Sequence, residues 1–158
     1  MWGTDWTKIK IGFQTWQLIT LIDFFSRKII ALDIQPNVNA GHMKAIYAKG
    51  LKNEDISHKP KLRADQGSPN KAYVMKDFMK DIGADLSFAR VRRPTDNAIT
   101  ERFYGTIKQE EIFVVGSYPD ETSAREEIED YIDFYNEDRP HQALWNFKPN
   151  EVHEVNNK

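Results

Sequence analysis

Three carboxylates in separate parts of the chain are the residues best suited to catalysis. Asp5 lies in the segment WGTDWT, Asp65 in LRADQG, and Glu101, 36 positions after Asp65, in DNAITERF. Carboxylate oxygens are the ligands that Mg²⁺ and Mn²⁺ prefer in proteins. Three acids in three different local contexts are what a site for two divalent ions needs, so the sequence predicts a metal site at Asp5, Asp65 and Glu101.

The separation of 36 positions is weak support by itself. With 13 Asp and 11 Glu in 158 residues, such a pair is expected about once by chance. Asp85 and Glu121 have the same separation, but Asp85 leads into an apolar run and Glu121 lies in the polar turn PDETS. Asp65 instead ends a short strand-like segment, and Glu101 lies one turn inside a predicted helix. Local context therefore selects Asp65 and Glu101, and we interpret the other pair as a decoy.

Hydrophobic patterning predicts the elements that position these acids. Residues 16–25 and 28–34 are rich in Ile, Leu and aromatics and are joined by Ser26 and Arg27, which predicts an antiparallel hairpin. The apolar run 18–22 indicates a strand buried on both faces, which requires helices on both sides of the sheet.

Later segments supply those helices and a further strand. Helices are expected over residues 40–49, 70–82 and 97 to about 112, with a strand over 86–91. One apolar stripe marks a last long helix, formed by Ala124, Ile128, Tyr131, Ile132 and Tyr135. The expected order places Asp5 on the first strand, Asp65 on the fourth and Glu101 on a late helix.

Composition and charge restrict the class of protein. With 40% hydrophobic and 12% aromatic residues, residues 1–158 can form one compact domain. The absence of cysteine excludes disulfides and thiolate catalysis, and no signal peptide or membrane-length apolar run is present, so a soluble cytoplasmic protein is expected. The net charge of −2 argues weakly against a self-sufficient nucleic-acid binder.

Charge is unevenly distributed along the chain. Residues 120–138 carry nine acids against one base, Arg125, which indicates a solvated helix face. Basic residues instead gather around Glu101, namely Arg90, Arg92, Arg93, Arg102 and Lys108. The basic stretch therefore lies beside the predicted chemistry.

The order of elements and the words around the acids resemble a known family. They are similar to the integrase core of DDE transposases, especially bacterial insertion-sequence transposases related to retroviral integrases. The resemblance covers nearly the whole chain and rests on WGTDWT, LIDFFSRKII, ADQGS, DNA followed by ERF, IKQE, and YNEDRPHQAL. It implies a ribonuclease H-like fold of the α/β class, with a mixed five-stranded sheet flanked by helices.

The resemblance also implies phosphoryl transfer on DNA. Asp5, Asp65 and Glu101 would hold two Mg²⁺ or Mn²⁺ ions about 3.5–4 Å apart, with Asp5 bridging them. Water as the attacking group would nick the end of the element, and the exposed 3′-hydroxyl would then join that end to target DNA. The implied partners are transposon-end and target DNA and a second copy of the chain in a homodimer, with no membrane partner.

Helical geometry and the resemblance together indicate DNA contacts near Glu101. Asn97, Gly105 and Lys108 fall on the same helix face as Glu101. Lys108 matches the family's basic residue seven positions after its glutamate, and we expect it to contact a phosphate. Gly105, which costs about 1 kcal/mol relative to Ala inside a helix, either lets DNA approach or packs closely against another backbone.

Two arginines complete the expected DNA-binding residues. Arg93 lies in the basic stretch before the predicted helix, and Arg102 directly follows Glu101. Arg102 points about 100° round the helix from Glu101, so its loss is expected to matter less than that of Lys108.

The remaining polar residues have simpler interpretations. Asp23 and Asp33, in or near the hairpin, are expected to be structural. His42, His58 and His153 have no ligand-like neighbours in the sequence.

The residues that follow the last long helix are interpreted from their context. His141, in the segment RPH, is expected to fix the end of that helix rather than to do chemistry. Trp145 and Phe147 lie in a polar tail, where they could dock a partner subunit.

The amino terminus and the rival functions complete the expectations. Because Met1 directly precedes the first matching segment, an amino-terminal helix-turn-helix is expected to be absent, as in a catalytic-core fragment. A non-catalytic DNA-binding or interaction module derived from a transposase, and a ribonuclease H-like nuclease, stay open as alternatives.

Overall fold

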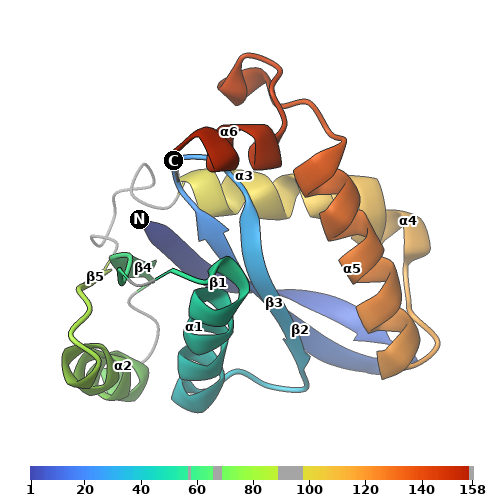
Figure 1. Cartoon of the computed structure of the whole chain (residues 1–158). Helices are drawn as coiled ribbons and strands as arrows, with labels where there is room; N and C mark the ends of the chain where they lie inside the picture. The colour runs from blue at the N-terminus through green and yellow to red at the C-terminus, as the bar shows by residue number, and fades with distance from the viewer. Residues whose placement is uncertain (57, 66–68, 89–97, 157–158) are drawn as a thin grey trace.

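A five-stranded mixed sheet in the order β3-β2-β1-β4-β5 forms the centre of the computed structural model, which describes residues 1–56, 58–65, 69–88 and 98–156 (Figure 1). The strands are β1 (Trp2–Ile11), β2 (Gln14–Asp23), β3 (Ile29–Gln35), β4 (Leu62–Ala64) and β5 (Leu86–Phe88). β2 is antiparallel to both β1 and β3, whereas β1, β4 and β5 run parallel to one another. The predicted hairpin and the predicted ribonuclease H-like fold are both confirmed.

Helices cover both faces of the sheet. They are α1 (Ala40–Glu54), α2 (Pro69–Asp81), α3 (Ala98–Ile107), α4 (Phe113–Val115), α5 (Glu121–Glu137) and α6 (Pro149–Asn156), with a π-helical turn η2 (Lys108–Ile112) and a 3-10 turn η3 (Gln142–Leu144). The predicted stripe on α5 is confirmed, since all five of its apolar residues are buried. The part of the predicted strand after residue 88 and the first residue of the predicted helix at 97 lie outside the described residues.

Two hydrophobic clusters lie on opposite faces of the sheet. One joins β1 and β2 to α3 and α5 and includes Ile9, Leu18, Ile22, Phe103 and Ile128. The other joins them to α1 and α2 and includes Trp2, Ile19, Leu21, Tyr47 and Met79. Successive side chains of a strand alternate between faces, so the continuous run 18–22, of which every residue is at most 1% exposed, supplies both clusters. This confirms the strand predicted to be buried on both faces.

The helix predicted over residues 40–49 is too short. α1 continues to Glu54 and ends at Asp55, whose φ of 47° is left-handed. Gly50 lies inside the helix against the sheet, where an added Cβ would come within 2.4 Å of Leu21 Cδ2. Beyond it, the Asn53 side chain donates to the Ile30 carbonyl at 3.0 Å. Close packing and this contact with β3 extend the helix past its glycine.

The helix predicted as continuous to about residue 112 is interrupted. Its α-helical part ends at Ile107 and the chain continues as the π-helical turn η2. A π turn contains one extra residue, and its effect is visible in burial: Ile112, five positions after buried Ile107, faces the core, while Glu111 is only half-buried. The extra residue keeps a carboxylate out of the apolar cluster.

No helix in the described ranges of the chain is both long and apolar enough to cross a membrane.

Candidate active site

Strand register brings Asp5 and Asp65 together. β1 and β4 are parallel neighbours with Trp2, Gly3 and Thr4 opposite Leu62, Arg63 and Ala64. Continuing this register by one residue places Asp65, directly after β4, beside Asp5. Residues at the same level of parallel strands point to the same face of a sheet. The two carboxylates that the sequence separates by 60 positions therefore share one edge of the site.

The face that Asp5 occupies is the one covered by α3. Odd-numbered β1 residues such as Ile9 belong to the cluster with α3 and α5. Burial, and after it the negative charge of Asp5, raises the pKa of the Tyr104 hydroxyl well above its usual range. Asp5 is paired with Thr20, whose Oγ1 contacts Tyr104 of α3, so the Asp5 side chain lies on the α3 side of the sheet. Asp5 is half-buried, and its Oδ1 accepts the Trp6 backbone N–H at 2.9 Å.

Tyr104 fixes α3 to the sheet at the level of Asp5. Its hydroxyl donates to the Asp5 carbonyl oxygen at 2.5 Å and is 2.8 Å from Thr20 Oγ1, and Thr20 is the residue paired with Asp5 across β1 and β2. Both Tyr104 and Thr20 are buried. Because Glu101 lies one turn before Tyr104 on the same helix, this contact sets the position of Glu101 relative to Asp5.

Glu101 lies in the first turn of α3 and is exposed. The helix dipole favours a carboxylate at this end. Gly105, one turn later, has no atom within 4 Å of the Cβ that an alanine would carry. Close packing of Gly105 against another backbone of this chain is therefore excluded among the described residues. Lys108, a further turn along, is half-buried, but Glu101 and Gly105 are both exposed, so this part of the Glu101 face of α3 is open to an approaching molecule.

The three acids do not form a ready-made ligand cluster in this structure. Within the described part of the chain, no group of three or more His, Cys, Asp or Glu side chains is arranged so that it could hold a metal ion. The structure places Asp5 and Asp65 side by side on adjacent strands and Glu101 on a helix fixed to β1. Like charges so placed repel one another, and a bound cation would relieve that repulsion.

The pair interpreted as a decoy lies at opposite edges of the sheet. Asp85 precedes β5, and its carbonyl oxygen accepts the Leu62 backbone N–H at 2.9 Å. Glu121 is ion-paired at 2.8 Å with Arg125, which also contacts Asp33 of β3. β3 and β5 are the two edge strands, so this geometry supports the decoy interpretation and the structural role expected of Asp33.

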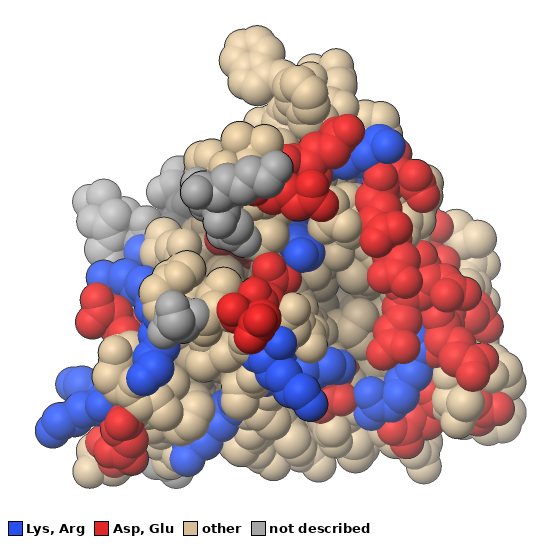
Figure 2. Space-filling view, viewed as in Figure 1, with Lys and Arg blue, Asp and Glu red and all other residues tan. Residues whose placement is uncertain are grey.

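The remaining DNA-contact predictions have different outcomes. Asn97 and Arg93 lie outside the described residues. Arg102 is exposed on α3, on the face next to that of Glu101. All nine acids of residues 120–138 are exposed, and Figure 2 shows an acidic band along α5. This confirms the predicted solvated face, which would repel DNA.

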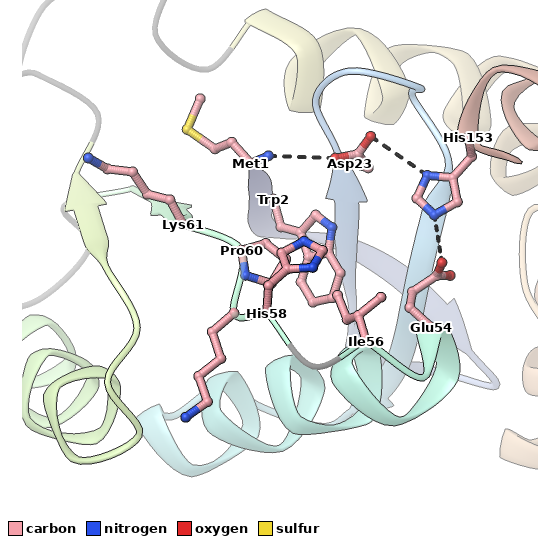
Figure 3. A pocket seen from close by; sticks show the side chains of 10 residues that line it. Met1, Trp2, Asp23, Glu54, Ile56, His58, Pro60, Lys61 and His153 are labelled. Carbon is pink, nitrogen blue, oxygen red and sulfur yellow. Dashed lines mark hydrogen bonds and ion pairs between the residues drawn. The ribbon is translucent and has the colours of Figure 1, made fainter. Parts of the chain in front are cut away.

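His153 is the residue that sequence reasoning missed. It has no ligand-like neighbours in the sequence, but in the folded chain its buried ring lies between two carboxylates (Figure 3). Its Nε2 is 2.6 Å from Glu54 Oε2, and its Nδ1 is 3.0 Å from Ser26 Oγ and 3.8 Å from Asp23 Oδ2. These partners come from α1 and from the end of β2, about 100 or more residues away in sequence. No local pattern could have revealed them.

The electrostatics of this cluster are those of a buried ion-pair network. Burial by itself lowers the pKa of His153, but hydrogen bonds to Asp23 and Glu54 outweigh it and raise the pKa to about 9. Burial likewise opposes ionisation of Asp23 and Glu54, and hydrogen bonds from His153 lower both pKa values nonetheless. Ser26 is fully buried, so the Ser-His-Glu alignment cannot present a nucleophile to a substrate. The network ties α6 to the sheet, and Asp23 is structural as expected.

The chain after α5 follows its predictions in part. His141 fixes the end of α5, with its Nε2 3.3 Å from the Tyr135 carbonyl oxygen and its ring 4.5 Å from that of Tyr135. Trp145 and Phe147 are 89% and 57% exposed, so they are available for docking. His42 caps α1 through Asn39.

Comparison with known proteins agrees with this geometry. Models of the integrase core domain match residues 1–94 and 82–149. The chain is 25% identical over 138 residues to the putative transposase InsK for insertion sequence element IS150 of Escherichia coli, covering 87% of this chain and 48% of that protein. It is 28% identical over 157 residues to the transposase for insertion sequence element IS904 of Lactococcus lactis, covering 99% of this chain and 62% of that protein. The chain thus spans about half to three-fifths of the length of these relatives.

Solved structures share the fold at low sequence identity. The catalytic core domain of HTLV-2 integrase in complex with magnesium superposes with a TM-score of 0.72 at 14% identity, over 96% of this chain and 94% of that one. The catalytic core domain of BIV integrase superposes with a TM-score of 0.69 at 15% identity, over 99% of this chain and 95% of that one.

Proposed function

The chain belongs to the integrase core domain family, and from this premise we propose that it is the catalytic core of a DNA transposase, a metal-dependent polynucleotidyl transferase. The observation that carries the proposal is the register of β1 and β4, which sets Asp5 beside Asp65, under the helix that carries Glu101. These are the acids of the three segments that resemble the DDE transposases. The reaction is transfer of a DNA phosphoryl group in two steps, strand nicking and strand joining.

The donor set fits two divalent cations such as Mg²⁺ or Mn²⁺. All three groups are carboxylates, the sequence has no cysteine, and hard oxygen ligands select these ions over zinc. Asp5, with its fixed place on the central strand, Asp65 and Glu101 would hold these ions. When bound, two such ions make the attacking oxygen a better nucleophile and stabilise the oxygen that leaves.

The protein's own residues contribute position and charge. Tyr104 holds α3 against β1, which limits the movement of Glu101 during the two steps. Gly105 leaves space for a DNA strand over α3, and Lys108 neutralises a phosphate of that strand. In the first step water breaks a phosphodiester bond and leaves a 3′-hydroxyl. In the second, that hydroxyl attacks a target phosphodiester, whose own 3′-oxygen leaves, so no covalent bond to the protein is formed.

We take the partners to be DNA and a second copy of the chain. The structures that share this fold include dimeric and trimeric forms of an integrase core and an assembled retroviral intasome. Two ends of a mobile element have to be joined to one target, and a homodimer would supply one active site to each end. The protein is expected to act in the cytoplasm, where the element's DNA lies.

Strand nicking and joining on supplied DNA test the proposal. The chain at high concentration should nick or join pre-nicked or branched duplexes only with Mg²⁺ or Mn²⁺. Asp5→Asn, Asp65→Asn and Glu101→Gln should each abolish this activity, without additive effects in combination, because the three groups act as one unit.

Matched controls come from the decoy pair. Asp85→Asn and Glu121→Gln carry the same chemical changes at the same sequence separation and should leave activity intact. Activity that survives a change at Asp5, Asp65 or Glu101 removes that residue from the site. Loss of activity in the controls as well would show that the effect comes from net charge alone.

A further inference from the structure

A pocket of about 350 Å³ lies between α3, the β2–β3 turn and the segment after α5. Three arginines from these three places line it, Arg102, Arg27 and Arg139, and none of its described lining residues is acidic. This is unusual in a chain of net charge −2 whose neighbouring helix α5 is strongly acidic. The pocket therefore concentrates positive charge beside an acidic helix.

Each arginine is held there by its local structure. Arg102 lines the pocket together with Ile99, Phe103 and Thr106 of α3. Counted from Ile99, the other three follow at three, four and seven positions, the spacing of one helix face. Arg27 lies in the β2–β3 turn with a φ of 64°, and its Nη1 donates to the Phe24 carbonyl oxygen at 2.5 Å. A left-handed backbone is uncommon for a residue other than glycine.

The third arginine already has a counter-ion. Arg139 Nη2 is 2.6 Å from Glu110 Oε1, and its Nε is 2.9 Å from Glu110 Oε2, a bidentate pair. The rings of Tyr135 and His141 form part of the wall beside it. Arg139 therefore forms part of the pocket wall, and its charge is largely neutralised by Glu110.

Arg27 and Arg102 supply the uncompensated charge. In the described part of the chain, neither is ion-paired with a carboxylate at hydrogen-bonding distance. Burial lowers the pKa of Arg27, the charges of Tyr135 and Asp23 raise it, and the positive charge of Arg102, the smallest of these effects, lowers it. Two guanidinium groups that repel each other across a small pocket would both be stabilised by an anion between them.

We propose that this pocket binds a backbone phosphate of the DNA substrate, with Arg27 and Arg102 as its two cationic contacts. The ligand follows from position and rests on the proposed function. Arg102 directly follows Glu101, about 100° round a helix that is roughly 10 Å wide. Successive phosphates of one strand rise about 3.4 Å, so a strand held at Glu101 and Lys108 reaches the pocket within a few nucleotides. The sequence predicts a DNA contact at Arg102 that matters less than that of Lys108, and the pocket instead makes Arg102 a full phosphate contact.

Anisotropy of a fluorescent duplex, titrated at several salt concentrations in EDTA, tests the pocket. Without divalent ions, binding is read independently of catalysis. Arg102→Gln should weaken binding to every sequence alike and lower the slope of log affinity against log salt by about one. Lys76→Gln on α2, an exposed residue across the sheet, removes the same charge. It should lower the DNA affinity and the salt slope less than Arg102→Gln does.

Arg27 needs two variants because of its turn conformation. Arg27→Gln should reproduce the effect of Arg102→Gln, and Arg27→Lys, which keeps the charge, should recover most of the affinity. Circular dichroism identifies any variant that fails to fold, in which case the Arg102 result decides.

Three results separate the possibilities. Wild-type affinity and slope for Arg102→Gln would overturn the proposal. A second result would overturn it as well: inorganic phosphate raises the melting temperature of the wild type but not of Arg102→Gln, while the two proteins bind DNA with equal affinity. The pocket would then bind free anions rather than DNA. A lowered slope with no strand nicking by the wild type would support the pocket and count against the catalytic proposal instead.

Discussion

Replacing Tyr104 by phenylalanine removes one oxygen atom and separates α3 from β1 at the level of the site. The ring would keep its place 5.3 Å from that of Phe103. The hydroxyl contacts to Thr20 Oγ1 and to the Asp5 carbonyl oxygen would be lost. Thr20 is fully buried and Asp5 is half-buried, so water can replace the lost bonds only in part.

The magnitude follows from those two unsatisfied groups. A buried polar group left without a partner costs about 1–3 kcal/mol. The half-buried Asp5 carbonyl costs less than the fully buried Thr20 hydroxyl, so the free energy of unfolding should fall by roughly 2–4 kcal/mol. For a chain of this length, 1 kcal/mol corresponds to about 2–4 °C in melting temperature. Below the transition the variant stays folded, yet Glu101 is no longer held against Asp5. Displacement of a catalytic group by about 1 Å can cost about 100-fold in rate.

Tyr47 provides the matched control. It is also fully buried, and its hydroxyl donates to the Pro60 carbonyl oxygen at 2.8 Å, on the opposite face of the sheet. Tyr47→Phe should lose comparable stability in thermal unfolding, while metal-dependent strand nicking at 20 °C stays at the wild-type level. Tyr104→Phe should lose stability and most of the nicking. Equal nicking by the two variants would mean that the Tyr104 hydroxyl only stabilises the fold.

Three further changes test other parts of the account. Folding raises the pKa of His153 to about 9, so protonated His153 stabilises the folded state by about 3 kcal/mol by linkage. This contribution is complete below pH 6.5 and is lost as the pH rises to 9. The lowered pKa values of Asp23 and Glu54 also stabilise the folded state, and this contribution is lost as the pH falls below about 4. The melting temperatures of wild type and His153→Gln, measured across this range, should converge at pH 9, and a constant difference would contradict the network. Lys108→Ala should weaken all DNA sequences alike and lower the salt slope by about one, with Mn²⁺ affinity retained; an unchanged slope would place Lys108 off the DNA path. Gly105→Ala should stabilise the chain by up to about 1 kcal/mol in urea unfolding and weaken DNA binding; undiminished binding would leave Gly105 without a role in the approach of DNA.

The sequence predicted those elements whose burial pattern is local and periodic. The run 18–22 could be recognised as a strand buried on both faces, and the α5 stripe as a helix, because a single period describes each. The position of Asp65 opposite Asp5 could not be predicted from periodicity, because it depends on the register between two strands that are far apart in the chain. The resemblance to a family supplied that pairing, and the sheet then gave it a physical basis.

The predictions failed where a distant contact decides the local structure. α1 continues past Gly50 because that glycine packs closely against Leu21 of the sheet, which no pattern within the helix can indicate. The π turn at Lys108–Ile112 exists because the core needs Ile112 rather than Glu111. His153 obtained its partners from two elements that meet only in the folded chain.

Calorimetric titration of Mn²⁺ tests the central claim most directly, because it reads the carboxylate site without DNA or catalysis. Wild type should bind Mn²⁺, Asp65→Asn should lose most of that affinity, and Asp85→Asn, the same change in the decoy pair, should bind as wild type does. Equal binding by all three proteins would contradict the assignment of Asp65 and with it the metal site between β1, β4 and α3.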